Sequence, residues 1–147
     1  MGGADWTFRA VPARRAAIAD LALSGKTIGL LGYDKDTPVA WCSIAPRAAF
    51  GAGLGPSSAA GLWSLTCFFI RADHRNQSGF SALLRAAEAF ASDRGATEIE
   101  AYPVAPDSPS YRFSGFLPSF EKAGYRKTGQ IGLRRNIVRK GPLRPQV

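Results

Sequence analysis

The segment 80–91 repeats its apolar residues at the spacing of an α-helix. Counted from its first residue, the apolar positions fall at offsets of 0, 3, 4, 7, 10 and 11 and are Phe80, Leu83, Leu84, Ala87, Phe90 and Ala91. This spacing places all of them on one face, as in a helix that packs against a core. The sequence therefore predicts a long amphipathic helix that ends at Gly95.

Two apolar runs on either side of this helix have the composition of β-strands. The run "LWSLTCFFI" at 62–70 is almost continuously apolar, which is typical of a central strand covered on both faces. The run "TEIEAYPV" at 97–104 follows the helix. Because a helix connects the two runs, we expect parallel strands and a central βαβ unit.

The chain before this unit predicts a helix, a hairpin and a loop. Segment 12–25 starts with proline and ends with glycine, an asymmetry that suits a helix. The runs 27–33 and 38–45 flank the turn "DKDT" and predict a β-hairpin. Segment 46–61 is dominated by glycine, alanine, proline and serine, so we expect a loop.

The chain after this unit predicts the closing elements. We expect a loop at 105–114, a short helix at 115–124 with Pro118 in its first turn, and one or two antiparallel strands at 125–140. The order of elements is that of a mixed α/β fold around one sheet. A length of 147 residues suits one domain, and we expect residues 1–147 to form it.

Composition narrows the class of protein. Hydrophobic residues make up 46% of the chain, which is enough for a core, and no run of 18 apolar residues predicts a membrane span. The N-terminus lacks the basic-then-apolar order of a signal peptide, so we expect a cytoplasmic protein. The cysteines Cys42 and Cys67 lie in apolar runs without metal-type spacing, and we expect reduced, buried thiols and no metal site.

The net charge of +8 is concentrated towards the C-terminus. From residue 122 onward there are eight basic residues and no acidic one: Lys122, Arg126, Lys127, Arg134, Arg135, Arg139, Lys140 and Arg144. Such a segment could attract nucleic acid or another polyanionic ligand. A solvated strand face is an equally good explanation, and a cofactor with several phosphates would also account for part of the excess.

A polar turn, "HRNQSGFS" at 74–81, runs straight into the long helix. The first turn of a helix has free backbone N–H groups and a partial positive charge, and small residues before it let these groups close around an anion. Arg75, Ser78 and Gly79 make a workable cradle for a diphosphate. The alternative is that Ser78 caps the helix and Gly79 is incidental. We expect His74, the only histidine, to order the loop before this turn.

The motif "RNQSGF" at 75–80, set between a strand and a helix, resembles the cofactor signature R/Q-x-x-G-x-G/A of the GNAT acetyltransferase superfamily. Arg75 fits the first position of the signature. Ser78 stands where glycine is usual, and Phe80 stands where glycine or alanine is usual. Gly79 is displaced by one position.

Two further segments resemble the same superfamily. "FEKAGY" at 120–125 is similar to the family's "YEKxGF", and "LLGYDKDTPVAWCSIAPR" at 30–47 is similar to the hairpin of an uncharacterised bacterial branch. The resemblance spans roughly residues 27–140. It implies a GNAT-like mixed sheet of about six or seven strands with flanking helices, within a single acyl-CoA N-acyltransferase-like domain.

The resemblance implies acetyl-CoA, or another acyl-CoA, as the co-substrate. In the family, the first strand of the βαβ unit splays from the second, and the pantetheine arm pairs with its backbone. The matching residues here are Phe68, Phe69 and Ile70. The diphosphate lies over the turn and the start of the helix, here Arg75, Asn76, Gln77, Ser78, Gly79 and Phe80.

The implied reaction is direct attack of an amine on the thioester, with a base to remove a proton and an acid to protonate the thiolate. Backbone N–H groups on the splayed strand would stabilise the oxyanion. For the base we single out Glu100, which alternates with Ile99 and shares a face with Glu98. The alternative is that the glutamates face solvent or pair with an arginine, which we favour for Glu98.

The acid is less defined, because the family often uses a tyrosine in the short helix and Phe120 stands at that position. Tyr111, Ser114 and Ser119 are nearby substitutes in the sequence, and Tyr111 is our candidate.

Three functions remain open. An acetyl-CoA-dependent N-acetyltransferase that acts on an amine ranks first. A GNAT-like module that senses acyl-CoA without turnover ranks second, because of Ser78, Phe80 and Phe120. A basic nucleic-acid-binding domain ranks last, since the basic segment lacks interleaved exposed aromatics. The oligomeric state stays open, although many relatives form homodimers through the final strands.

Overall fold

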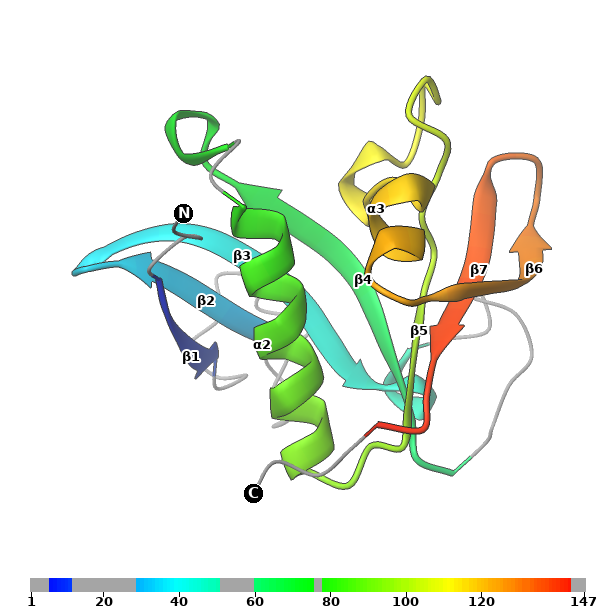
Figure 1. Ribbon diagram of the computed structural model, residues 1–147, viewed down its shortest axis with the longest axis horizontal. Helices are drawn as coiled ribbons and strands as arrows, with labels where there is room; N and C mark the ends of the chain where they lie inside the picture. Colours follow the sequence, from blue (N-terminus) through cyan, green and yellow to red (C-terminus); the bar gives the residue numbers. More distant parts are fainter. Residues whose placement is uncertain (1–5, 12–28, 51–59, 76–77, 144–147) are drawn as a thin grey trace.

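The described residues of the computed structural model, which are 6–11, 29–50, 60–75 and 78–143, form a seven-stranded mixed sheet (Figure 1). The strand order is β1-β2-β3-β4-β5-β7-β6. The strands are β1 (Thr7–Val11), β2 (Gly29–Asp34), β3 (Thr37–Pro46), β4 (Leu62–Ile70), β5 (Glu98–Ala101), β6 (Arg126–Ile131) and β7 (Arg135–Lys140). This sheet, with its flanking helices, confirms the predicted fold class.

In the part of the chain that the structure describes, two α-helices and three short 3-10 turns accompany the sheet. The helices are α2 (Gly79–Asp93) and α3 (Leu117–Lys122), and the turns are η2 (Arg47–Ala49), η4 (Ala72–His74) and η5 (Arg112–Ser114). Helix α2 lies across one face of the sheet and packs on β2, β3 and β4 (Figure 1). No helix within the described ranges has the length and apolar character needed to span a membrane.

The apolar stripe predicted for the long helix is the face that α2 buries against the sheet. Leu83, Leu84, Ala87 and Ala91 are buried in the main core, and Phe80 is partly buried. Beyond the helix, Gly95 has a φ of 95°, a conformation that glycine adopts without steric cost. The predicted end of the helix is therefore confirmed.

The predicted βαβ unit and hairpin are also confirmed. Strand β4 runs parallel to β5, with α2 between them in sequence. Strands β2 and β3 pair antiparallel with an irregularity between Gly32 and Tyr33. The closing strands β6 and β7 pair antiparallel, and β7 lies next to β5. Strand β5 is shorter than predicted, because the chain leaves β4 after Ala101.

The remaining points of comparison with the sequence concern the first strand, two segments outside the described residues and the cysteines. Strand β1 pairs antiparallel with β2 and was not predicted, because five residues of an edge strand carry too little pattern. The helix predicted at 12–25 and most of the loop at 46–61 lie outside the described residues. Both cysteines are free; Cys42 is buried as expected, and Cys67 is only half-buried.

Candidate active site

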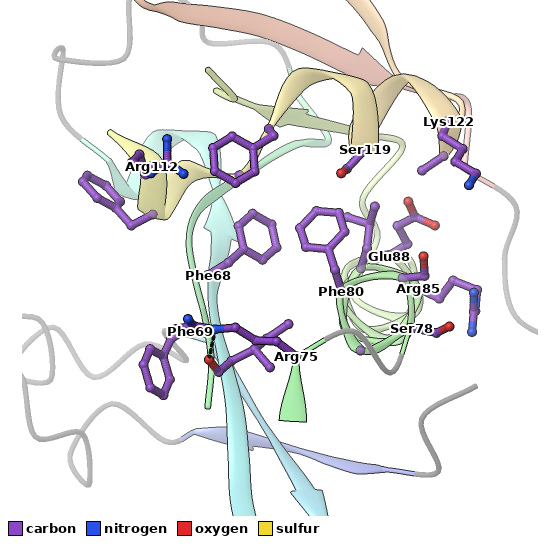
Figure 2. A pocket seen from close by; sticks show the side chains of 18 of the residues that line it. Phe68, Phe69, Arg75, Ser78, Phe80, Arg85, Glu88, Arg112, Ser119 and Lys122 are labelled. Atoms are coloured by element: carbon purple, nitrogen blue, oxygen red, sulfur yellow. Dashed lines mark hydrogen bonds between the residues drawn. The ribbon is translucent and has the colours of Figure 1, made fainter. Parts of the chain in front are cut away.

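A cleft of about 1220 Å³ opens between the end of β4, the first turns of α2 and the η5–α3 segment (Figure 2). Its walls come from both sides of the βαβ unit, so residues distant in sequence meet there. Three features of these walls decide what the cleft can bind: a free strand edge, an uncapped helix and an excess of cations.

The strand edge is free because β4 outlasts its parallel partner. Strand β4 pairs with β5 only from Leu62 to Leu65, opposite Glu98 to Ala101. On its other edge it stays paired with β3 as far as Ile70. From Thr66 to Ile70, the edge turned towards β5 has no ladder partner among the described residues, and Phe68 to Ile70 line the cleft. This edge offers main-chain donors and acceptors to an extended, amide-containing ligand.

Helix α2 begins at the other wall without a side-chain cap. Ser78 is its N-cap residue and makes no capping hydrogen bond through its side chain. The alternative in which Ser78 caps the helix is therefore not what the structure shows. Ser78, Gly79, Phe80 and Ser81 line the cleft. The N–H groups of this first turn form a site with partial positive charge, suited to an anion.

The altered glycine pattern of the turn has a steric cause. Ser78 has φ 61° and ψ 20°, the left-handed conformation that glycine adopts freely and other residues adopt at a cost of roughly 1–2 kcal/mol. A Cβ atom at Gly79 would overlap the ring of Trp6. The indole at the start of the chain thus makes glycine necessary at position 79, while serine tolerates the conformation at 78.

The cleft carries more cations than carboxylates. The single acidic side chain among its lining residues is Glu88, which accepts a 2.8 Å hydrogen bond from Tyr125 and lies 3.3 Å from Lys140 Nζ. The cations of the lining are Arg75, Arg85, Arg112, Lys122 and Lys140. Five cations against one carboxylate favour a ligand with several negative charges.

Phe68 and Phe80 form the apolar floor of the cleft, and their rings pack on Phe120. The ring centroids of Phe68 and Phe80 lie 5.1 Å apart, those of Phe80 and Phe120 5.4 Å, and those of Phe68 and Phe120 5.8 Å. Figure 2 shows the rings of Phe68 and Phe80 facing each other between β4 and α2. Phe120 is fully buried beneath them. The residue at the position of the family's tyrosine is therefore part of the core.

The candidate acids separate clearly. Ser119 lines the cleft, and its side chain is directed into it (Figure 2). Tyr111 is 41% exposed, is not part of the lining, and stacks under the guanidinium of Arg135 at 4.4 Å. Ser114 is buried and also lies outside the lining. The structure does not bring Tyr111 to the cleft, because the loop before α3 turns it outwards.

Glu100 is not placed as a general base would be. It is 2% exposed and lies outside the cleft lining. Tyr102 donates a 2.8 Å hydrogen bond to Oε1, Arg139 donates a 2.7 Å bond to Oε2, and Arg47 Nε lies 3.7 Å from Oε1. Both carboxylate oxygens are engaged. The pairing with arginine that was expected for Glu98 belongs to Glu100.

Several predicted cofactor residues do meet at one cleft. Phe68, Phe69, Ile70, Arg75, Ser78, Gly79 and Phe80 all line it. Arg75 uses its Nε to donate a 3.0 Å hydrogen bond to the carbonyl of Ile70, which ties the turn to β4. Asn76 and Gln77 lie outside the described residues. Sequence reasoning missed Trp6, for which no local signal exists, and did not prefer Ser119.

Comparison with known families decides the relationship. The model of the Acetyltransferase (GNAT) family matches residues 4–116 of this chain. The chain belongs to the GNAT acetyltransferase family. A search of curated proteins found none that matches it.

Solved structures of GNAT proteins share the fold. Ard1 from Thermoplasma volcanium is similar with a TM-score of 0.65 and 12% identity, over 95% of this chain and 99% of that one. The GNAT domain of PAT from S. lividans has a TM-score of 0.60 and 19% identity, over 86% and 70% of the two chains.

A third similar structure contains coenzyme A. It is the PaiA N-acetyltransferase from Thermoplasma acidophilum in complex with coenzyme A, with a TM-score of 0.55 and 15% identity. The match covers 77% of this chain and spans 59% of the PaiA chain. At these identities the likeness establishes the fold alone.

The contact between Gly79 and Trp6 predicts a position-specific effect on stability. Gly79→Ala should lower the free energy of unfolding by about 1–3 kcal/mol, because the new methyl group overpacks against the indole. Urea unfolding measures this. Ser78→Gly is the matched control and should not destabilise, since glycine relieves the left-handed conformation. In a Trp6→Leu background, Gly79→Ala should cost less; an equal cost in both backgrounds would show that Trp6 is not the cause.

The buried ion cluster predicts a structural role for Glu100. Glu100→Ala should destabilise the protein by about 3–5 kcal/mol, because it removes the carboxylate that Arg47 and Arg139 share. Glu98→Ala, on the same strand, should cost less than about 1 kcal/mol. Urea unfolding of both variants checks the difference. A Glu100→Ala protein of full stability but without activity would restore Glu100 as the base.

Proposed function

We propose that this protein is an acetyl-CoA-dependent N-acetyltransferase, which transfers an acetyl group to an amine by direct attack on the thioester. One observation carries the proposal: the free edge of β4 and the uncapped start of α2 open into the same cationic cleft. Coenzyme A combines an amide-rich arm with a diphosphate and a further phosphate, and these are the chemical groups that such walls would bind.

The residues present fit this ligand. The arm would lie along Phe68 to Ile70, where main-chain groups face the cleft, and the apolar floor would take its methylene groups. The diphosphate would lie at the first turn of α2, next to Ser78 and Ser81. Arg85 and Lys122 line the cleft beyond this turn and would balance the remaining charge. The complex of PaiA with coenzyme A supports the same use of this fold.

Direct transfer is favoured over an acyl-enzyme. The bound thioester supplies an already activated acyl group, so a protein nucleophile is unnecessary. Burial raises the pKa of the Cys67 thiol, which disfavours the thiolate, and this residue lies outside the cleft lining. The chain's task is then to hold the two reactants in alignment and to supply a proton to the departing sulfur.

We assign this step to Ser119: its hydroxyl would pass to the departing thiolate the proton that the amine loses as its nitrogen–carbon bond forms and the carbon–sulfur bond breaks. Phe120 stands at the family's tyrosine position and has no hydroxyl. Ser119 carries the hydroxyl nearest to that position in the sequence, and its side chain is directed into the cleft. Lys122 stands three residues further along α3 and also lines the cleft. No base is assigned, because Glu88 is engaged by Tyr125 and Lys140.

A sensing module without turnover is the second candidate, and the burial of Phe120 favours it. An enzyme would bind acetyl-CoA and turn it over, whereas a sensing module would only bind it. The acceptor amine, the homodimer, the cytoplasmic location and the extent of the domain over residues 1–147 stay predictions.

Calorimetric titration with acetyl-CoA tests the diphosphate site. The protein should bind acetyl-CoA, and Ser78→Asp should weaken binding at least about tenfold, or about 1.4 kcal/mol, because a carboxylate would stand where the diphosphate binds. Ser78→Asn is the matched neutral control and should bind like the parent, since asparagine tolerates the left-handed conformation. No binding at millimolar acetyl-CoA would remove both the enzyme and the sensor; equal affinities would place the diphosphate elsewhere.

Thiol release from acetyl-CoA with a panel of amines tests turnover. Ser119→Ala should lower kcat by about 10²-fold or more while the dissociation constant for acetyl-CoA is unchanged, because only proton transfer is lost. Tyr111→Phe should retain full activity. Loss of activity in Tyr111→Phe but not in Ser119→Ala would reverse this assignment, and binding without release by any amine would favour the sensor.

A further inference from the structure

Two side chains connect the turn after β4 with the sheet: Arg75 bonds to β4 itself, and His74 bonds to the β2–β3 hairpin. The Nδ1 of His74 lies 2.8 Å from Oδ1 of Asp73, within the same 3-10 turn. Its Nε2 lies 3.0 Å from Oδ2 of Asp34, the last residue of β2. A single imidazole therefore bridges two carboxylates that lie 39 positions apart in the chain (73 − 34 = 39), and it connects the turn with the β2–β3 hairpin.

Trp6 connects the same imidazole with the head of α2. The ring centroids of Trp6 and His74 lie 6.2 Å apart, and the indole also contacts Gly79, the first residue of α2. The two ends of the turn thus rest on one aromatic ring. Anything that releases His74 from Asp34 loosens the first of these ends, and the N–H groups that would bind an anion lie at the other end, where Gly79 contacts the same indole.

Only the doubly protonated ring can donate to both carboxylates. A neutral imidazole has one N–H, so its other nitrogen would direct a lone pair at a carboxylate oxygen. The hydrogen bond with Asp73 and then that with Asp34 raise the pKa of His74 above its ordinary value. The site therefore favours the imidazolium near neutral pH.

The charge around the ring depends on its proton. Asp34 faces the ring from β2 and Asp73 from η4, and Arg71 contacts Asp73 at 2.7 Å. Trp6, just before β1, does not titrate, and Arg75 donates to the carbonyl of Ile70. In the hairpin turn, Lys35 and Asp36 cancel. Loss of the proton makes the charge of this cluster more negative by one unit, beside the site for an anion.

We propose that His74 is a positioning residue for the anion-binding turn: its imidazolium holds the turn in the conformation that receives the diphosphate, and loss of the proton weakens the binding of coenzyme A. This proposal rests on the proposed function, because it requires the diphosphate to bind at the start of α2. By linkage, bound coenzyme A must in turn hold the proton more tightly.

The sign of the pH dependence follows from the raised pKa. Below the pKa of His74 the tie is intact and affinity is full. Affinity falls as the pH rises through that pKa. The tie's contribution to the stability of the folded protein has the same sign: it is fully present below the ordinary histidine pKa of about 6.5 and is lost as the pH rises through the raised value.

His74 is the only histidine of the chain, so its imidazole can be followed without assignment. In protein that carries no histidine tag, NMR of the ring should show a pKa above about 6.5, which rises further with saturating coenzyme A. Asp34→Asn should lower the pKa of His74 in the protein without coenzyme A. This variant keeps the ring and removes one charged acceptor, so it remains informative if a substitution of His74 fails to fold.

Calorimetry from pH 6 to pH 9 measures the consequence for binding. The parent protein should lose about tenfold in affinity for coenzyme A for each unit by which binding raises the pKa of His74. His74→Gln should bind weakly, with little pH dependence of its own. The terminal phosphate of coenzyme A titrates at about pH 6, as phosphate monoesters do, and this affects both proteins equally. The ratio of their affinities at each pH therefore reports the effect of His74 alone.

The outcomes separate this proposal from the function on which it rests. If coenzyme A binds but leaves the His74 titration unmoved, and His74→Gln binds equally well at every pH, the positioning role is wrong and the proposed function stands. If coenzyme A does not bind at all, the proposed function fails and this role fails with it. An unchanged pKa in Asp34→Asn would overturn the tie itself.

Discussion

The early end of pairing between β4 and β5 is the constraint on which the rest of this structure depends. After Leu65 and Ala101 the strands part, while β4 stays anchored to β3 as far as Ile70. If the two strands paired along their full length, the main-chain groups on this edge of β4 would all be hydrogen-bonded within the sheet. Because it does not, the edge of β4 is available to a ligand, and α3 and η5 have room to form the opposite wall.

The head of α2 shows how distant packing decides a local motif. A signature glycine has two distinct uses: to adopt a left-handed conformation, and to let another group approach closely. In this chain the two uses fall on different residues, Ser78 and Gly79, because Trp6 occupies the space above Gly79. The displaced glycine is therefore explained by a contact with a residue far away in the sequence.

Periodicity in the sequence was sufficient for the central elements and insufficient for the site. The helix at 80–91 and the strand at 62–70 have long, regular patterns that tertiary packing does not override. Alternation correctly placed Glu100 on one face of β5, but it carries no information on what covers that face, and two arginines do. The outward turn of Tyr111 and the reach of Trp6 depend on three-dimensional contacts that no short window records.

Four of the C-terminal cations have positions or partners that a uniformly solvated basic tail would not have. Lys122 and Lys140 line the cleft, and Arg139 is committed to the buried carboxylate of Glu100. Arg135 lies over Tyr111, which covers one face of that exposed aromatic ring. These four cations are thus divided between the cleft, the buried ion cluster and an aromatic stack, whereas Arg126, Lys127 and Arg134 are exposed. A phosphate-rich co-substrate would need only the cations that converge on one cleft, and Lys122 and Lys140 are among them.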